Sequence, residues 1–330
     1  MSSRRSVAYF ALLATFAVSA CSGDDSAGPA TDAPTTLSPA TEAPTTVTLD
    51  PAVEAMMYTE AGPYPVGVTT LELAAGNKVE VWYPAVEGTT GAEFYDTRDF
   101  VPPAIKALLT ADVPARYDYT AGRDAVVADG QFPIVLFSHG YSGIRLQSTF
   151  LTAHLASWGM IVAAPDHWSR DLFHVLSAPV GDRESATGEL LGTLDLVTSG
   201  DDDPASLLQG HVDVSRVIAL GHSAGGGTIV SAAKDDRVDG YISMASGVLG
   251  MGSANATTTA PPTFVNKPSF FIAGALDAII SAEESTRPSF EAVPGPSRLW
   301  IIDGVGHNGF DDFCTFGNGS GIIGVALASG

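Results

Sequence analysis

Positive charge is scarce in this sequence of 330 residues. It has 16 lysines and arginines against 37 aspartates and glutamates, which gives a formal net charge of −21. No basic cluster exists beyond Arg4-Arg5, so the chain would repel the phosphates of nucleic acids and of anionic lipids. We therefore expect no nucleic-acid partner, and contact with a membrane only through an N-terminal lipid.

The N-terminus lacks an apolar run long enough to cross a bilayer. The run at residues 7–18 follows a basic start and ends in Val18-Ser19-Ala20-Cys21. A spanning helix needs about 20 residues, so residues 1–20 are interpreted as a secretory signal peptide. The last four residues resemble the bacterial lipobox, in which the cysteine is lipidated. We expect an extracellular lipoprotein of the cell envelope anchored at Cys21; ordinary cleavage after Ala20, giving a secreted protein, is the alternative.

Large apolar side chains are nearly absent from residues 22–50, which are rich in proline, threonine and alanine. Such a segment cannot offset its ordering entropy by burial, so residues 21–56 are predicted to form an extended tether. From residue 57 the composition becomes globular, and 45% of the whole chain is hydrophobic. Residues 57–330 are therefore predicted to form one domain, which we expect to be monomeric.

The globular part alternates short apolar runs with segments of helical length. Continuous runs are typical of strands that are covered on both faces. They read PIVLFS, MIVAAP, VIAL, GYISMAS, SFFIAG and RLWIID, and two alternating runs, TTLELA and KVEVWYPA, precede them as a predicted antiparallel hairpin. Helical segments such as RLQSTFLTAHLASWG lie between several of the runs. This order predicts an α/β fold with a mostly parallel central sheet, helices on both faces and antiparallel N-terminal strands.

Ser223 lies between the run VIAL and a helical segment, in the sequence Gly221-His222-Ser223-Ala224-Gly225. This is G-x-S-x-G in the strand-turn-helix context that exposes a nucleophilic serine. The glycines are expected because a strand that reverses sharply into a helix leaves no room for side chains. A purely structural turn is the alternative. A phosphate-binding loop is excluded because no lysine follows the glycines.

A serine hydroxyl needs a base, which on a turn of this kind comes later in the chain, after the acid. Of the seven histidines, only His307 follows Ser223. It lies in the glycine-rich stretch IIDGVGHNGF after the last predicted strand. His307 is therefore the predicted base.

The predicted acid is Asp277, because it directly follows SFFIAG at the carboxyl end of a predicted strand. Asp303 is the second choice, because it is too close to His307 in sequence to be the first. The remaining acids lie at the opposite edge of the sheet or in a polar helical stretch: Asp235, Asp236, Asp239, Glu283, Glu284 and Glu291. The developing oxyanion needs fixed donors. We assign the backbone N–H groups of Ala224 and of Tyr141, with Gly140 as the alternative to Tyr141.

The motifs FSHGYSG, GHSAGGG, GALD and VGHNGFDD, in this order, resemble the α/β-hydrolase superfamily. The stretch AGPYPVGVTTLELAAGNKVEVWYPA with APDHWSRD is similar to the platelet-activating-factor acetylhydrolase-like branch, and HGYSG with GHSAGGG is similar to bacterial cutinases. The resemblance covers about residues 60–315. It implies a serine esterase that forms an acyl-enzyme, carries the catalytic roles to the residues above, and implies neither a cofactor nor a metal.

The spacing of the predicted strands bears on the substrate. No long insertion separates the strands around the site, so we expect an open site without a large lid and a preference for short acyl esters. Polyester or cutin-type hydrolysis is an alternative. A non-catalytic envelope-binding lipoprotein is the alternative of another class.

Asp166-His167 is expected to shape a loop or line the pocket, with Trp168 beside it.

The C-terminal stretch departs from the hydrolase pattern. It ends in GIIGVALASG, without the amphipathic helix that usually closes this sheet. If Cys21 carries the lipid, Cys314 has no partner among these residues, and a lone cysteine in an oxidising compartment suggests a missing one. We therefore expect a domain truncated at its C-terminus, in which Cys314 pairs with a cysteine beyond residue 330.

Overall fold

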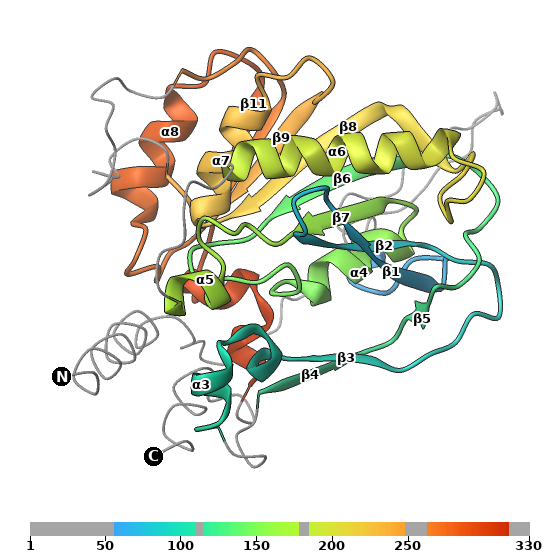
Figure 1. Ribbon diagram of the computed structural model, residues 1–330. Helices are drawn as coiled ribbons and strands as arrows, with labels where there is room; N and C mark the ends of the chain where they lie inside the picture. The colour runs from blue at the N-terminus through green and yellow to red at the C-terminus, as the bar shows by residue number, and fades with distance from the viewer. Residues whose placement is uncertain (1–55, 110–114, 178–184, 248–262, 317–330) are drawn as a thin grey trace, which may run out of the picture.

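The computed structural model describes residues 56–109, 115–177, 185–247 and 263–316 (Figure 1). One sheet runs through the molecule, and a two-stranded sheet formed by β3 and β4 lies beside it. The strands are β1 (Val66–Glu72), β2 (Lys78–Pro84), β3 (Glu93–Asp96), β4 (Arg116–Tyr119), β5 (Gly122–Arg123), β6 (Phe132–Ser138), β7 (Ile161–Pro165), β8 (Val212–His222), β9 (Gly240–Met244), β10 (Ser269–Gly274) and β11 (Ser297–Ile302).

From β6 onward, helices lie between most consecutive strands, although the described residues hold none between β9 and β10. The α-helices are α3 (Pro103–Lys106), α4 (Thr149–Ser157), α5 (Leu172–Leu176), α6 (Ala186–Asp202), α7 (Ala224–Ala232) and α8 (Arg287–Glu291). Short 3₁₀ turns occur at η1 (Thr97–Phe100), η3 (His307–Phe310) and η4 (Asp312–Thr315), and a π-turn occurs at η2 (Ala282–Thr286). None of the helices described here is long and apolar enough to cross a membrane.

The large sheet has the strand order β11-β10-β9-β8-β6-β7-β2-β1-β5. From β7 to β11 all neighbours are parallel, whereas β2 pairs antiparallel with both β7 and β1. The predicted mostly parallel sheet with an antiparallel N-terminal hairpin is confirmed. Parallel strands end at one edge, so the loops after β6, β8, β10 and β11 meet there, and this edge carries the site.

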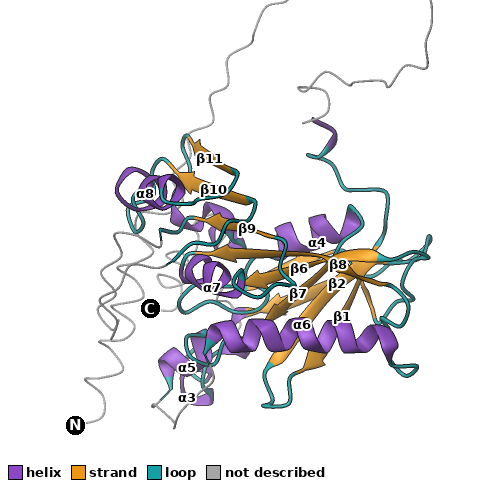
Figure 2. Ribbon diagram, turned by 90° about the horizontal axis from the view of Figure 1, so that it is seen from above, coloured by secondary structure: helices purple, strands orange, loops and turns teal. Residues whose placement is uncertain are grey.

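Both faces of the sheet are buried, as the continuous apolar runs predict. Along β6, Ile134 and Leu136 pack in the cluster that contains α6 and α7, whereas Val135 and Phe137 pack in the cluster that contains α4. This alternation is the period of two that a strand imposes on its side chains. Figure 2 shows α6 and α4 on opposite sides of the sheet.

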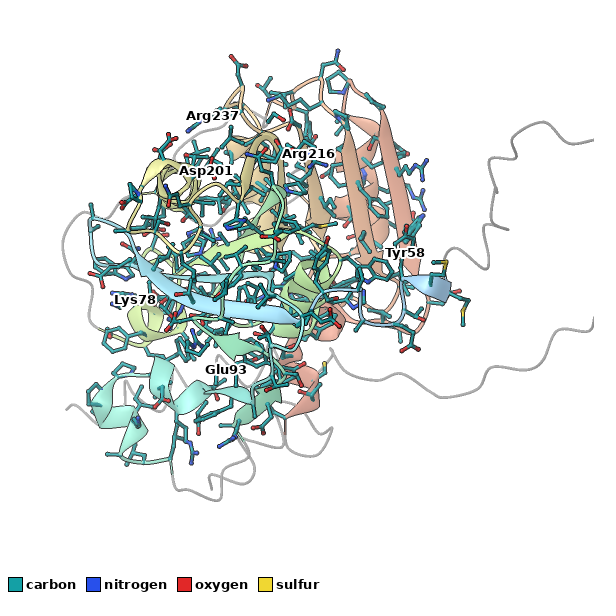
Figure 3. The ribbon with its side chains drawn as sticks, turned by 90° about the vertical axis from the view of Figure 1, so that its right-hand side faces the viewer. Tyr58, Lys78, Glu93, Asp201, Arg216 and Arg237 are labelled. Atoms are coloured by element: carbon teal, nitrogen blue, oxygen red, sulfur yellow. The ribbon has the colours of Figure 1, made fainter. Side chains whose placement is uncertain are left out.

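The far edge of the sheet carries charged pairs rather than the predicted site residues. Figure 3 shows Arg216 of β8 and Arg237, which follows α7, on the same side of the molecule as Asp201. Arg237 pairs with Asp235 at 2.8 Å, and the side chain of Asp239 accepts a hydrogen bond from the backbone of Val217 near the middle of β8. The acids that follow α7 are therefore excluded from the site by their position.

Of the two cysteines, the structure describes only Cys314. Cys21, the signal peptide and the tether lie outside the described residues, as does the C-terminal stretch 317–330. Cys314 is disulfide-bonded, with its partner outside the described residues. It is therefore not a free thiol, and the predicted boundaries of the signal, the tether and the domain stay predictions.

Candidate active site

Ser223 occupies a sharp turn between the end of β8 and the start of α7. Its backbone has φ 54° and ψ −121°, a strained conformation for a residue with a side chain. A Cβ added to Gly221 would lie 2.4 Å from the carbonyl oxygen of Gly225, and a Cβ on Gly225 would lie 2.0 Å from that of Ser138. Both glycines of the motif are therefore required sterically, and the turn presents Ser223 at the carboxyl edge of the sheet.

The structure brings Ser223, His307 and Asp277 into one hydrogen-bonded row. The Nε2 atom of His307 lies 2.9 Å from the Oγ atom of Ser223, and its Nδ1 atom lies 2.8 Å from the Oδ2 atom of Asp277. Asp277 follows β10 and His307 follows β11, so three loops at one sheet edge supply the row. This is the geometry in which an imidazole can take a proton from a hydroxyl while a carboxylate orients it.

The carboxylate of Asp277 is held in place from its other side. Its Oδ1 atom accepts hydrogen bonds from the backbone N–H groups of Ile279 at 2.9 Å and of Ile280 at 2.8 Å. These bonds leave Oδ2 directed at His307, and the side chain is buried. Asp303, the second choice from sequence, is exposed and makes no hydrogen bond or ion pair with any described residue. Its side chain lies outside the row.

Between Gly140 and Gly143, in the loop after β6, one backbone N–H group has no hydrogen bond among the described residues. Gly140 donates to the Oε1 atom of Gln147 at 3.2 Å, Ser142 donates to the carbonyl oxygen of Arg170 at 2.9 Å, and Gly143 donates to that of Gly140 at 3.2 Å. The N–H of Tyr141 has no such partner. This favours Tyr141 over Gly140 as an oxyanion donor.

Ala224, the second predicted donor, is the first residue of α7. A helix leaves its first N–H groups without intrahelical acceptors, and its dipole favours negative charge at that end. The N–H of Ala224 makes no hydrogen bond within the described part of the chain. It follows Ser223 directly, so it is available beside the serine hydroxyl.

The buried side chain of Arg170 holds the same loop through hydrogen bonds. Its guanidinium donates to the carbonyl oxygen of His139 at 2.7 and 3.1 Å, to the Oγ1 atom of Thr228 at 2.7 Å and to the Oγ atom of Ser138 at 2.8 Å. Burial lowers the pKa of Arg170 to about 10, so the side chain remains charged at neutral pH. It thus ties the end of β6 to the middle of α7. Arg170 belongs to the stretch APDHWSRD, but neither that stretch nor its position 53 residues before Ser223 indicates these contacts.

A second serine-histidine-carboxylate row lies in the same buried cluster. The Oγ atom of Ser138 is 2.9 Å from the Nε2 atom of His167, whose Nδ1 atom is 2.9 Å from the Oε2 atom of Glu189. Ser138 and His167 are wholly buried and Glu189 is 2% exposed, so an ester cannot reach the hydroxyl. Burial raises the pKa of Glu189 to about 7 and lowers that of His167 well below its usual range. The row braces the core, in keeping with the loop-shaping role expected of His167.

Asp166 and Trp168, which were also named from the sequence, lie outside the hydrogen-bonded row of Ser223, His307 and Asp277. Asp166 forms an ion pair with Arg145 at 2.7 Å. Trp168 is half-buried, with its ring 5.4 Å from that of His174. The described residues hold no cluster of three or more histidine, cysteine, aspartate or glutamate side chains that could bind a metal ion.

Comparisons with known proteins agree with this geometry. The model of the family described as PET hydrolase-like (PETase) matches residues 121–323, more than half of the chain. The protein named Cutinase est2 of Thermobifida alba is 24% identical over 176 residues, which are 52% of this chain and 52% of the cutinase. The platelet-activating factor acetylhydrolase of Cavia porcellus is 24% identical over 323 residues, which cover 81% of this chain and 71% of that protein. The chain therefore spans about half of the length of the cutinase.

Proposed function

The chain belongs to the PET hydrolase-like family, and from that premise we propose that it hydrolyses carboxylic esters through an acyl-enzyme. Ser223 is the nucleophile, His307 the general base and then acid, and Asp277 the carboxylate that orients His307. The backbone N–H groups of Tyr141 and Ala224 form the oxyanion hole. The observation that carries this proposal is the hydrogen-bonded row from Ser223 Oγ through His307 to Asp277.

In the acylation step, Ser223 Oγ attacks the ester carbonyl carbon while His307 Nε2 takes the hydroxyl proton. The carbonyl oxygen becomes negative, and the two N–H groups stabilise it without reorganisation because the helix end and the loop are already in place. His307 then gives the proton to the departing alcohol. Asp277 stabilises the imidazolium during this step because its Oδ2 atom faces Nδ1 at 2.8 Å.

In the deacylation step, water replaces the alcohol. His307 takes a proton from the water as it attacks the acyl carbon, and the same N–H groups hold the second oxyanion. His307 then returns the proton to Ser223 Oγ, and the carboxylic acid leaves. His307 is the donor or the acceptor in every proton transfer of this cycle.

The decisive experiment compares the protein with Ser223→Ala. The substitution should lower ester turnover by several orders of magnitude and abolish labelling by a fluorophosphonate, while leaving the unfolding midpoint nearly unchanged. Residual turnover at the original rate would refute the nucleophile. Absence of turnover and labelling in the unsubstituted protein would favour the non-catalytic envelope-binding lipoprotein.

We propose short acyl esters as the preferred substrates. Two exposed apolar side chains neighbour the catalytic groups in sequence: Tyr141 is 67% exposed and Leu276 is 48% exposed. They can contact an acyl chain or an aromatic acid at an accessible site. The absence of a large lid stays a prediction, because residues 178–184 and 248–262 lie outside the described part. In a series of p-nitrophenyl esters, kcat/KM should peak between two and six carbons; a steady rise to sixteen carbons would contradict this preference.

Polyester hydrolysis is the second candidate, and membership in the PET hydrolase-like family favours it. A polymer chain must reach the serine from outside, and the exposed side chains of Tyr141 and Leu276 are apolar groups that it can contact. The same protein and its Ser223→Ala variant should be incubated with an amorphous polyester film. Soluble acid released only by the unsubstituted protein supports the candidate, and none above the Ser223→Ala background contradicts it.

We further propose that the enzyme acts outside the cytoplasm, as a monomer held to the cell envelope by a lipid on Cys21, which requires that the disulfide of Cys314 joins it to a cysteine other than Cys21. The secretory pattern of residues 1–20 and the polar composition of the following tether support this arrangement. The partner is then the ester itself, and the membrane is contacted through the lipid. Secretion without an anchor is the alternative.

A further inference from the structure

Gln147 and His222 connect the three loops that form the proposed active site. The backbone N–H of Gly140, in the loop after β6, donates to the Oε1 atom of Gln147 at 3.2 Å. The Nε2 atom of Gln147 lies 3.0 Å from the Nδ1 atom of His222, and the Nε2 atom of His222 lies 3.0 Å from the carbonyl oxygen of His307. Both connecting side chains are buried. One continuous chain of hydrogen bonds thus runs from the oxyanion loop to the loop of the base.

The direction of each hydrogen bond in this chain follows from its two ends. Gly140 N–H can only donate, so the oxygen of the Gln147 amide accepts and its nitrogen donates to His222 Nδ1. The carbonyl oxygen of His307 can only accept, so His222 Nε2 must carry a proton. His222 is therefore neutral, with its proton on Nε2. Burial lowers its pKa to about 3, which is consistent with this single state.

The glycines of the loop after β6 permit the close approach of Gln147 and His222. A Cβ added to Gly143 would lie 2.1 Å from the Oε1 atom of Gln147, and a Cβ added to Gly140 would lie 3.3 Å from the Nδ1 atom of His222. The rings of His222 and His307 have centroids 4.9 Å apart. His222 also precedes Ser223 in the turn. The nucleophile, the base and the oxyanion loop therefore share one contact group.

We propose that Gln147 and His222 are positioning residues that hold the oxyanion loop and the His307 loop in register with Ser223. This inference rests on the proposed ester hydrolysis. Gln147 acts on the loop that presents the N–H of Tyr141, and His222 acts on the backbone of His307. Neither side chain takes or gives a proton during the reaction. Because a displacement of about 1 Å can cost about 100-fold in rate, loss of either connection should lower kcat more than it raises KM.

Two substitutions of His222 separate the two connections. His222→Asn retains an acceptor near the position of Nδ1 and should keep Gln147 oriented, but it has no donor that reaches His307. His222→Gln retains a donor near the position of Nε2 but removes the acceptor for Gln147. Each should lower kcat by about 10- to 100-fold, with KM for a short ester changed by less than about 3-fold. Both kcat values are measured per active site, counted by titration with a fluorophosphonate, so that unfolded protein does not contribute.

Gln147→Glu gives a readout that a merely structural role would not change. A carboxylate can accept from Gly140 N–H, but it has no proton to donate to His222 Nδ1. Binding one proton restores the missing donor. The ratio of the variant's kcat/KM to that of the unsubstituted protein should therefore rise as the pH falls from 8 to 6. A ratio that does not change with pH would overturn the assigned connection.

His211→Gln is the matched control. His211 is half-buried, and its ring contacts the carbonyl oxygen of Gly130 at 3.1 Å before β8 begins. This variant should keep the full kcat per titrated site. Full kcat per site in both His222 variants, or a loss confined to KM, would overturn the proposal. If the unsubstituted protein shows no ester turnover, the proposed function fails; if it turns over esters and the variants match it, only the positioning role fails.

Discussion

Two aspartates near His307 could serve as its acid, and their surroundings differ. Asp277 is buried, with one carboxylate oxygen held by two backbone N–H groups and the other 2.8 Å from His307. Asp303 is exposed and lies outside the hydrogen-bonded row. Position in sequence alone favoured Asp277 because it follows a strand directly. The buried hydrogen bonds give the physical reason for that preference.

We predict that Asp277→Asn lowers kcat by about 10³- to 10⁴-fold. The amide cannot stabilise the imidazolium, and it can hold His307 in the wrong tautomer. Asp303→Asn, the matched control, should change kcat by less than about 2-fold, since an exposed residue away from the reacting atoms has little effect. The measurement is the steady-state turnover of a short p-nitrophenyl ester at pH 8. A larger loss in the Asp303 variant would exchange the two roles.

Single residues of the site differ in how readily the sequence revealed them. His307 could be chosen because no other histidine follows Ser223. Tyr141 could be proposed from its distance after a strand. The roles of Gln147 and Arg170 were missed because they depend on side-chain contacts with loops far away in sequence, which the stretch APDHWSRD around Arg170 does not indicate. Residues that react are constrained by spacing, whereas residues that support them are constrained by tertiary packing.

At the scale of elements, the turn between β8 and α7 is the most constrained part of the fold. A Cβ on Gly225 would meet the Ser138 carbonyl oxygen at 2.0 Å, whereas a Cβ on Gly227 would meet nothing within 4 Å. The two residues are only two positions apart. They therefore form a matched pair for testing the turn.

Gly225→Ala should lower the free energy of unfolding by about 1–3 kcal/mol, because the backbone of β6 or α7 must shift to admit the methyl group. The shift also moves Ser223, so turnover should fall sharply. Gly227→Ala should raise stability by about 0.5–1 kcal/mol, since alanine loses less entropy than glycine inside a helix. Chemical denaturation of both variants measures the difference. Equal effects of the two substitutions would contradict the steric account.

The strands of the large sheet could be predicted because burial on both faces leaves a continuous apolar run in the sequence. The small sheet could not. Its strands read EFYD and RYDY, with only Tyr95 and Asp96 buried, and they pair across the 19 residues from 97 to 115. Nothing local distinguishes such segments from a loop, and the pairing itself stabilises them.

The start of α4 shows how tertiary contacts set the end of a helix. The sequence predicts a helix over residues 145–159, but the observed one begins at Thr149. The carboxylate of Asp312 accepts hydrogen bonds from the backbone N–H groups of Thr149 at 2.8 Å and of Phe150 at 3.1 Å. A capping group far away in sequence thus supplies what a local N-cap usually provides. The same contact ties α4 to the segment that follows His307.

At the scale of the whole molecule, a strongly acidic domain is predicted to lie on a tether attached at Cys21. Cys21→Ser should release the protein from the membrane fraction, because a serine cannot receive the thioether-linked lipid. Fractionation followed by mass analysis of the mature N-terminal peptide measures this. Full-length protein with Ser223→Ala serves as the control and should remain in the membrane fraction. An N-terminal peptide whose cysteine carries no lipid, or is freed only by reduction of a disulfide, would contradict the anchor.

The buried histidines around the site make the stability of the whole fold depend on pH. Burial lowers the pKa values of His139 and His222 to about 3 and lowers that of His167 well below its usual range. In the unfolded chain an imidazole titrates near pH 6.5. Between about pH 6.5 and 3 the unfolded state therefore binds more protons than the folded state. The contribution of these groups to stability is complete above pH 6.5 and is lost as the pH falls.

Buried carboxyl groups act in the opposite direction. Burial raises the pKa values of Glu189 and Asp312 to about 7, above the value near 4 of an unfolded carboxyl. Their contribution to stability is complete below about pH 4 and is lost as the pH rises through 7. In the unsubstituted protein, the buried histidines and the buried carboxyl groups therefore change the free energy of unfolding with pH in opposite directions. The difference between that protein and a variant isolates one group.

We predict that His222→Gln makes stability less sensitive to acid. The amide keeps a donor for the His307 carbonyl oxygen but does not titrate, so the variant lacks one group that must stay neutral in the fold. Its free energy of unfolding should be lower than that of the unsubstituted protein at pH 7.5, because the bond from Gln147 is lost. The gap should narrow by up to about 1.4 kcal/mol per pH unit between pH 6 and 4. Urea denaturation at several pH values measures both curves. A gap that stays constant over this range would show that His222 does not resist protonation, and would remove the single protonation state on which the connection between Gln147 and His307 depends.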